Sequence, residues 1–384
     1  MLKKTSMRLL LINRRYIPGE AWTNRVLAYA RGFAERGIDV QLWYLIGDKQ
    51  RRHYDLSIPG VTVVSFWERD GWIPKKNRYI SLLVNLFRCK RYIQPTDCVF
   101  VYGVVSYITK VALRKTQQVY GEITEHPFMS GSDENENLSR SRYQLLSKLK
   151  GLFVISHSLK LYFSKNGLNE NKIYVSNMFV DTNRFEGVKR NIREKYFAYC
   201  GVVSKYKDGV DTLIKAFSKV HTTHPDYKLY IIGRFESEEV RNDLESMTVS
   251  LEIADSVVFT GQVLSEKMPP LLTNAQALVL ARPANLQSKY GFPTKLGEYL
   301  ATGNPVIVTD VGEIGTFLKD RENAVVVPPD EVNVFAEGMN WVIEHPEESE
   351  AIGRKGQELA RTEFSYNTQC EKVLNIICGT SNSL

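Results

Sequence analysis

Residues suited to binding an anion gather in the second half of the chain, in the stretch Ser288–Asp310 (SKYGFPTKLGEYLATGNPVIVTD). The pattern predicts a loop, a short helix that opens at Thr294 with Lys295 in its first turn, and a buried strand at Pro305–Thr309. A helix start offers unsatisfied backbone N–H groups and the positive end of the helix dipole, and a lysine adds a full charge. This combination favours a bound phosphate or carboxylate. The loop residues whose backbone would approach such an anion are Gly291, Phe292 and Pro293.

Glu298 lies one turn further along the same predicted helix. A carboxylate there would repel a phosphate in direct contact, but it would accept hydrogen bonds from the hydroxyls of a neighbouring sugar. The alternative is a helix-capping glutamate, which requires Glu or Gln at the third position after the Thr294 cap, and that position is Gly297. The stretch therefore predicts a diphosphate beside a ribose, as in a nucleotide-sugar.

A second strand–loop–helix segment in the same half carries another lysine. In Cys200–Phe217 (CGVVSKYKDGVDTLIKAF), a predicted strand ends at Gly201 and a helix begins near Gly209. Lys207 lies in the loop between them and would reach a phosphate as a point charge. On its own, this residue has an ordinary solvated lysine as the alternative interpretation.

The first half opens with a comparable glycine-bearing loop, Ile17–Arg25 (IPGEAWTNR). Gly19 would let the backbone cover the phosphates of a bound ligand, and Glu20 or Asn24 would face an acceptor. A plain turn before a helix is the alternative.

Titratable side chains follow another predicted strand of the first half, in Tyr120–Phe128 (YGEITEHPF). The segment offers Glu122, Glu125 and His126 at a strand end, where polar groups of an α/β protein meet a ligand. Glu125 and His126 are therefore candidates for handling the proton of an acceptor hydroxyl. A structural histidine is the alternative.

The elements that must position these residues alternate between strands and helices along the chain. Such alternation predicts an α/β protein whose mostly parallel sheets are covered by helices on both faces. Two halves of similar size predict two doubly wound, Rossmann-like domains facing a cleft. The predicted strands are Arg8–Asn13, Asp39–Leu45, Val61–Phe66, Cys98–Tyr102, Val119–Glu122, Leu152–Ile155, Tyr196–Gly201, Lys228–Ile232, Val257–Thr260, Ala277–Leu280, Val306–Thr309 and Ala324–Val327. The predicted helices include Asn24–Arg36, Val210–His221 and Tyr366–Ile377.

The boundary between the two domains is predicted near residue 180. Residues 1–180 would form the first domain, with a C-terminal helix at about 366–384 packed back on it. Residues 181–365 would form the second domain, and Met178–Gly187 would be the linker. In this scheme the first domain binds the acceptor and the second binds the nucleotide-sugar donor.

Charge is distributed unevenly over these halves. The total of +7 divides into +14 for residues 1–180 (28 Lys and Arg, 14 Asp and Glu) and −7 for residues 181–384 (22 and 29). A basic first half favours an anionic partner. We expect an anionic membrane surface or a lipid-linked phosphate acceptor and no nucleic acid, because no nucleic-acid-binding motif occurs. Lys75–Tyr92 places apolar residues between basic clusters, a pattern of an interfacial helix or of a core helix with solvated ends.

The remaining features favour a cytoplasmic protein that reaches the inner face of the membrane at most peripherally. The chain has no apolar run long enough to span a bilayer, and its N-terminus lacks the pattern of a signal peptide. Its five cysteines show no CxxC spacing and are expected to be reduced. No DxD, HExxH or Cys/His ligand spacing occurs, so neither a metal nor another cofactor is expected. The polar segment Met129–Asn137 is predicted to be a flexible loop.

The order and spacing of five segments resemble the retaining glycosyltransferases of family 4, which have the GT-B fold. Each segment alone is weak evidence, and their order and spacing together make a specific match, with the resemblance running over nearly the whole chain. The segments are Ser176–Phe185 (SNMFVDTNRF), Gly201–Phe217 (GVVSKYKDGVDTLIKAF), His224–Gly233 (HPDYKLYIIG), Val257–Val263 (VVFTGQV) and Gly291–Thr309 (GFPTKLGEYLATGNPVIVT).

This resemblance implies a role for each matching position. Lys207 would hold the donor diphosphate and Glu298 the donor ribose. Backbone groups from Gly291 to Thr294 would contact the phosphates and the sugar, and the segment ending at Val263 would abut the base. The implied reaction moves a sugar from a nucleotide diphosphate donor to an acceptor hydroxyl with retention at the anomeric carbon, in the assembly of a surface polysaccharide or glycolipid.

Two positions depart from the family pattern. Val202 stands where the family usually has an arginine, and Tyr290 stands where its paired-glutamate motif usually begins. Arg282 and Lys295 would then supply the missing positive charge. Two alternatives stay open: a nucleotide-sugar epimerase on a similar fold, and a catalytically silent relative that acts as a partner of another transferase. An NAD-dependent dehydrogenase is disfavoured, because neither opening strand–helix loop contains GxGxxG.

Overall fold

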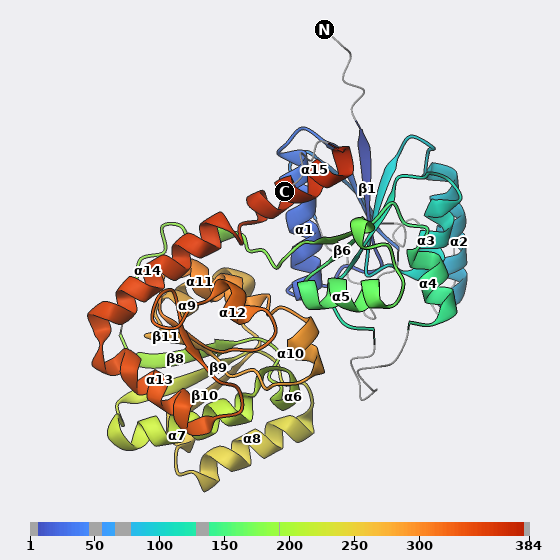
Figure 1. The fold of residues 1–384 in the computed structure, drawn as a ribbon. Helices are drawn as coiled ribbons and strands as arrows, with labels where there is room; N and C mark the ends of the chain where they lie inside the picture. The colour runs from blue at the N-terminus through green and yellow to red at the C-terminus, as the bar shows by residue number, and fades with distance from the viewer. Residues whose placement is uncertain (1–6, 46–55, 66–77, 128–137, 192, 380–384) are drawn as a thin grey trace. The chain divides into compact units, whose positions relative to one another are not determined.

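The computed structural model describes residues 7–45, 56–65, 78–127, 138–191 and 193–379. It divides into two compact units, Met1–Asn177 with Tyr366–Leu384, and Met178–Ser365. Each unit holds one parallel sheet flanked by helices (Figure 1). The predicted class, α/β with two doubly wound sheets, is confirmed.

The sheet of the first unit has the strand order β3-β2-β1-β4-β5-β6-β7. The order reverses between β1 and β4, so the loops after these strands lie at the point where open α/β sheets bind ligands. Its strands are β1 (Arg8–Asn13), β2 (Asp39–Tyr44), β3 (Val61–Ser65), β4 (Cys98–Tyr102), β5 (Val119–Ile123), β6 (Gly151–Val154) and β7 (Ile173–Val175). Its helices are α1 (Ala21–Ala34), α2 (Arg78–Tyr92), α3 (Ser106–Leu113), α4 (Arg140–Leu146), α5 (His157–Lys165) and α15 (Tyr366–Cys378).

The C-terminal helix α15 packs on α1 in this unit (Figure 1). Gly32 makes the close approach possible, because a Cβ there would lie 2.5 Å from the Cys370 Sγ. The Tyr366 hydroxyl donates to the Glu35 carboxylate at 3.1 Å, which ties the start of α15 to the end of α1.

The sheet of the second unit has the order β10-β9-β8-β11-β12-β13, which reverses between β8 and β11. Its strands are β8 (Lys195–Cys200), β9 (Tyr227–Ile232), β10 (Val257–Gly261), β11 (Ala277–Leu280), β12 (Val306–Thr309) and β13 (Val325–Val327). Its helices are α6 (Lys205–Asp208), α7 (Val210–Thr223), α8 (Glu238–Ser250), α9 (Met268–Thr273), α10 (Leu286–Tyr290), α11 (Lys295–Ala301), α12 (Ile314–Phe317), α13 (Val332–Glu344) and α14 (Pro346–Thr362). Residues of β11 and β12 are fully buried, as expected for parallel strands with both faces covered.

Three predicted loops contain helical turns. Helix α1 begins at Ala21, so the loop predicted to continue to Thr23 already holds its first turn. Ser288–Tyr290, predicted as loop, is the end of α10, which Asn285 starts with a capping box. The loop predicted to hold Lys207 is the single turn α6, where the Ser204 hydroxyl caps the helix by accepting from the Lys207 N–H.

The segment predicted as a linker, Met178–Gly187, is packed into the second unit. Met178 is fully buried, and the Val180 N–H donates to the Phe364 carbonyl at 2.7 Å. The segment then forms the 3-10 helix η3 (Thr182–Phe185). It is therefore part of the fold of this unit, because its apolar side chains are buried there.

Two sequence predictions fall wholly or partly outside the described residues. Met129–Asn137 lies outside them, and Lys75–Tyr92 is described only from the start of α2 at Arg78. Among the helices that the structure describes, none is both long and apolar enough to cross a bilayer.

Candidate functional site

The loop after β8 presents Lys207 at the carboxyl edge of the second sheet. Its N–H donates to the Ser204 hydroxyl at 3.1 Å, and its carbonyl accepts from Arg282 Nε at 3.3 Å. Within the described part of the chain, the Lys207 ammonium makes no ion pair or hydrogen bond. The backbone of this residue is therefore fixed while its charge remains available to a ligand.

Gly209 allows the turn α6 to approach the end of β11. Its φ of 63° lies in the left-handed region, and a Cβ there would fall 1.9 Å from the Ala281 carbonyl oxygen. Any side chain would push Lys207 away from the sheet edge, so glycine is required for this geometry.

Asp208 organises the neighbouring charges. This carboxylate is 1% exposed and lies 2.5 Å from Lys295 Nζ, 3.9 Å from Arg282 Nε and 2.8 Å from the Tyr199 hydroxyl. Burial alone would raise the pKa of Asp208, but Lys295, Arg282 and the hydrogen bonds hold it below its usual value. Asp208 is therefore charged at neutral pH. Burial lowers the pKa of Lys295 and of Arg282, and the charge of Asp208 opposes both shifts.

Lys295 and Arg282 were predicted to supply positive charge for the phosphates. The structure pairs both of them with Asp208, and Arg282 is only 2% exposed. Their direct contact with a phosphate stays a prediction. Lys207 differs from both, because no carboxylate among the described residues forms an ion pair with it.

The start of α11 offers fewer free donors than predicted. The N–H of Leu296 donates to the Pro293 carbonyl at 3.1 Å, and the N–H of Gly297 donates to the Thr294 carbonyl at 3.3 Å. The helix spans only Lys295–Ala301, so its dipole is small as well. Anion binding by this helix start alone is therefore weaker than the sequence suggested.

The loop before α11 has structural reasons for its composition. The Phe292 ring is 5% exposed and packs against the rings of Phe317 and Phe364 at 5.7 and 5.8 Å. Gly291 has an extended backbone, and a Cβ there would lie 2.8 Å from the carbonyl oxygen of Gln287 in α10. The predicted contacts of Gly291–Thr294 with phosphate therefore concern backbone atoms only and stay a prediction.

Glu298 is held by a residue that the sequence analysis missed. Arg184, on η3, forms an ion pair with Glu298 Oε1 through Nη1 and donates from Nη2 to the Ser265 carbonyl at 3.0 Å and hydroxyl at 3.1 Å. The Glu298 side chain is 24% exposed, and its Oε2 makes no hydrogen bond with any described residue. Arg184 lies in one of the segments that carry the family resemblance. The neighbouring sequence did not indicate which carboxylate it would bind.

The predicted base-side residue Val263 lies in the loop that follows the last residue of β10, Gly261. Val263 is half-buried, and Ser265, two residues further on, is the residue that Arg184 binds. The loop predicted to abut the base is therefore tied to Arg184 and through it to Glu298.

In the first unit, the predicted acceptor residues lie at the start of α1. Gly19 is exposed with a φ of 81°, and Glu20 is the N-cap residue, whose carbonyl accepts from the Asn24 N–H at 3.0 Å. Asn24 is exposed in the first turn. These positions form the turn that the alternative interpretation expected, and their contact with a ligand stays a prediction.

The three titratable residues predicted at the end of β5 lie in different environments. Glu122 lies inside the strand, is fully buried and pairs with Arg25, so the expectation that it meets a ligand at the strand end is wrong. His126 is 2% exposed, with its ring 4.3 Å from that of Tyr162, whereas Glu125 is exposed. Glu125 therefore reaches solvent while His126 belongs to the packed interior, and their role in proton transfer stays a prediction.

Comparison with known proteins places the second unit in a family. Residues 181–359 match the family model of the glycosyl transferases group 1. The D-rhamnosyltransferase WbpZ of Pseudomonas aeruginosa is 28% identical over 185 residues, which cover 48% of this chain and 45% of that protein. A GDP-mannose-dependent monoacylated alpha-(1-6)-phosphatidylinositol monomannoside mannosyltransferase of Corynebacterium glutamicum is 28% identical over 177 residues, 44% of each protein. The match thus spans less than half the length of these curated relatives.

A solved structure extends the likeness to both units. The structure of Anabaena HepE in complex with UDP aligns with 97% of this chain and 100% of its own, with a TM-score of 0.73 and 16% identity. The chain has the GT-B fold, and its second unit is a group 1 glycosyltransferase domain. Arg184, Lys207 and Glu298 all fall within the residues that match the family model.

A buried ion pair lies in the first unit, beside the predicted acceptor loop. Arg25 is 4% exposed and contacts Glu122 at 2.7 Å, and it also donates to the carbonyls of Ser176 and Asn177 at 2.8 and 2.9 Å. The Tyr29 hydroxyl donates to the same Glu122 oxygen at 2.7 Å. Arg25 is the last residue of the predicted acceptor loop and had no predicted role. A charged residue on the buried face of a helix nevertheless requires a partner.

Replacing Arg25 with methionine is expected to destabilise the first unit by about 3–5 kcal/mol, because it leaves the Glu122 carboxylate buried without its counter-ion. Urea-induced unfolding at neutral pH would measure the loss. Arg36→Met is the matched control, since Arg36 makes its contacts with Asn367 at the exposed end of the same helix. Equal stability of the Arg25 and Arg36 variants would contradict this account of the buried pair.

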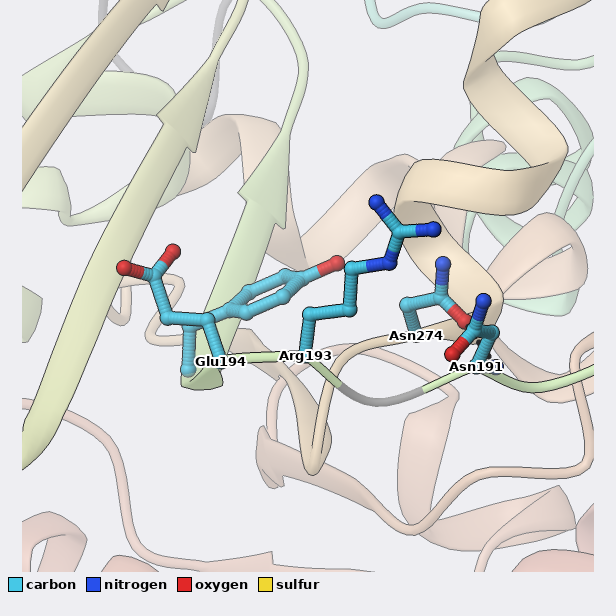
Figure 2. A pocket seen from close by; sticks show the side chains of 5 residues that line it. Asn191, Arg193, Glu194 and Asn274 are labelled. Atoms are coloured by element: carbon cyan, nitrogen blue, oxygen red, sulfur yellow. Dashed lines mark hydrogen bonds between the residues drawn. The ribbon is translucent and has the colours of Figure 1, made fainter.

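A pocket lies elsewhere in the second unit, at the start of β8 (Figure 2). It is lined by Asn191, Arg193, Glu194, Tyr196 and Asn274. Glu194 already contacts Lys228 at 2.5 Å and accepts from the Tyr230 hydroxyl at 2.5 Å. The predicted donor residues lie at the opposite, carboxyl end of the sheet, and none of them lines this pocket.

Proposed function

We propose that this chain transfers a sugar from a nucleoside diphosphate sugar to an acceptor hydroxyl with retention at the anomeric carbon. The observation that carries the proposal is the presence of two groups after the switch-point strands β8 and β11, in the residues that match the group 1 family model. These groups are the Lys207 ammonium on α6, which no described residue binds, and the Glu298 carboxylate on α11, which Arg184 holds. A cation suits a diphosphate, and a carboxylate suits the hydroxyls of ribose.

The charges support departure of the diphosphate. Negative charge develops on the leaving group during transfer, and pre-positioned cations stabilise it. Lys207 would contact the phosphates, and Lys295 and Arg282, which share the Asp208 carboxylate, would add positive charge near it. The leaving phosphate would take the acceptor proton on the same face of the sugar, so that the new bond forms on the side from which the old bond breaks.

The acceptor is assigned to the first unit. Glu20 and Asn24 would meet it, and Glu125 and His126 are the candidates for its proton. A saccharide or a lipid-linked saccharide fits the basic first half, and the two relatives are named as a rhamnosyltransferase and a phosphatidylinositol monomannoside mannosyltransferase. We therefore propose a role in surface polysaccharide or glycolipid assembly.

The test is a thermal-shift screen against UDP-, GDP- and ADP-sugars, followed by product analysis with and without saccharide acceptors. A donor that binds the native state raises the unfolding temperature by mass action. We expect one class of donor to stabilise the protein and the sugar to appear on an acceptor. Conversion of the nucleotide-sugar without any acceptor would favour an epimerase. Donor binding without turnover, together with retained binding of a second transferase, would favour the silent partner that Val202 and Tyr290 suggested.

Transfer is expected to survive EDTA with little loss of rate. The sequence has no DxD motif, and the cations named above are placed to take over the neutralisation of the diphosphate. Initial rates with and without EDTA would be compared, followed by addition of Mg²⁺ or Mn²⁺. A sharp loss that Mg²⁺ or Mn²⁺ restores would contradict metal independence.

Salt-sensitive binding to anionic vesicles is expected for the first unit, with the protein at the inner face of the membrane. Helix α2 exposes Phe87 at 71% and Tyr92 at 46% beside Lys90 and Arg91. Basic residues attract anionic lipid and an exposed aromatic side chain enters the interface. Phe87→Ser should reduce flotation with phosphatidylserine vesicles, whereas Leu161→Ser, which removes another exposed apolar side chain of this unit, should not. Absence of flotation at low salt would contradict the membrane assignment.

A further inference from the structure

We infer that Arg184 is a positioning residue that holds Glu298 for the ribose of the donor and joins it to the loop on the side of the base. The inference rests on the proposed function and deepens it, because it assigns recognition of the ribose hydroxyls to a pair of residues. The geometry that carries it lies entirely within the second unit.

The guanidinium of Arg184 bridges two elements that follow different strands. Nη1 pairs with Glu298 Oε1 on α11, and Nη2 donates to both the carbonyl and the hydroxyl of Ser265 at 3.0 and 3.1 Å. Ser265 begins the 3-10 helix η5 (Ser265–Lys267), just after the loop that holds Val263. A planar fork of donors suits this double contact, and a lysine would make only part of it.

Arg184 is itself fixed by its surroundings. The Asp181 carboxylate accepts from the Asn183 N–H at 3.2 Å at the start of η3, and Phe185 is 7% exposed. The Val180 N–H is bonded to the Phe364 carbonyl at 2.7 Å. An anchored backbone lets a long side chain hold its partner in one place, which is what recognition of a hydroxyl pair requires.

The pair also resolves an electrostatic conflict at the site. An isolated Glu298 carboxylate would repel the diphosphate that Lys207 attracts. Arg184 neutralises that charge through Oε1 and leaves Oε2, which makes no hydrogen bond with a described residue, to accept from a ribose hydroxyl. Glu298 can therefore recognise ribose without a net negative charge beside the phosphates.

The experiment compares ligands that differ only in the ribose hydroxyls. Dissociation constants would be measured by calorimetry for UDP, GDP and ADP, then for the 2′,3′-dideoxy analogue of the tightest binder and for inorganic pyrophosphate. The readout is the ratio of the dideoxy to the parent dissociation constant. Wild-type protein should show a ratio of about tenfold or more, because a hydrogen bond to a charged group is lost.

Three variants and a control identify the source of that ratio. Arg184→Met and Glu298→Gln should each bring the ratio close to one, and the double variant should lower it no further, since the two residues act as one unit. Arg184→Lys keeps the charge and should recover part of the ratio. Arg241→Met removes an arginine from an exposed ion pair on α8 and should leave the ratio unchanged.

The outcomes separate this inference from the proposed function. If wild-type protein binds none of the nucleoside diphosphates, both are overturned. A second outcome concerns wild-type protein that discriminates between ribose and dideoxyribose. If Glu298→Gln removes this discrimination and Arg184→Met keeps it, only the role of Arg184 is overturned. Tighter binding by Arg184→Met would make Arg184 a competitor of the ligand and would also overturn it. Should the methionine variant fail to fold, Arg184→Lys decides: a ratio equal to that of wild type contradicts the double contact with Glu298 and Ser265.

Discussion

Replacement of Asp208 with asparagine is expected to lower the free energy of unfolding by about 3 kcal/mol at neutral pH, because two buried cations lose their shared counter-ion. Asp208 is 1% exposed, and Lys295 and Arg282 both face it. Lys295 can relieve the strain by releasing a proton, but Arg282 stays charged. Urea-induced unfolding followed by circular dichroism would measure the loss.

The effect should depend on pH in a defined direction. Burial is outweighed by the two cations, so the pKa of Asp208 in the folded protein is lower than in the unfolded chain. A carboxyl with a lowered folded pKa contributes stability above its unfolded pKa, near 4, and that contribution disappears as the pH falls through the folded pKa. The stability that the Asp208 carboxylate contributes should therefore shrink as the pH falls below about 4.

A matched aspartate provides the control for this prediction. Asp243 contacts Lys205 at 2.7 Å on the surface of the same unit, and its side chain is 52% exposed. Water already solvates such a pair, so Asp243→Asn should change stability little. Equal losses for Asp208 and Asp243, or a loss at Asp208 that does not vary between pH 5 and 3, would contradict the buried cluster.

Replacement of Lys207 with alanine is expected to lower kcat/KM for the nucleotide-sugar by about 100-fold or more, as for removal of a charge-stabilising donor from an active site. The protein should keep its unfolding temperature, because within the described residues the ammonium has no partner to lose. A fall in activity without a fall in stability distinguishes Lys207 from Asp208. Steady-state rates and thermal unfolding of the same preparation would show both.

Lys205→Ala is the natural control, since Lys205 lies two residues away on the same turn and pairs with Asp243. It should leave kcat/KM close to the wild-type value. Lys207→Arg should recover part of the activity by keeping the charge. An unchanged kcat/KM in Lys207→Ala would remove this lysine from the donor site.

The strands were predictable because their signal is local. Arg8–Asn13, Cys98–Tyr102, Ala277–Leu280 and Val306–Thr309 have the predicted bounds, since short apolar runs between turn residues specify buried parallel strands. β7 was missed because three residues carry too little pattern to recognise. The helical turns α6 and α10 were missed for a related reason: side-chain caps rather than apolar periodicity define them.

The charged partners could not be predicted in the same way. Arg184 and Glu298 are 114 residues apart, Asp208 and Lys295 are 87 apart, and Arg25 and Glu122 are 97 apart. No periodicity connects residues at such separations, and a lone charge in the sequence does not reveal whether water or another side chain will solvate it. This is why Lys295 and Arg282 were expected beside a phosphate and were found beside Asp208.

The sequence alone determined the class of this protein: two doubly wound sheets, a group 1 glycosyltransferase domain in the second half, and Lys207 and Glu298 as the residues of interest. The tertiary structure decided the state of those residues. It left the Lys207 ammonium available, gave Glu298 the partner Arg184, and neutralised part of the positive charge through Asp208. The physical reason is that a side chain's chemical type is local, whereas its burial and its counter-ion depend on which distant segments the fold brings together.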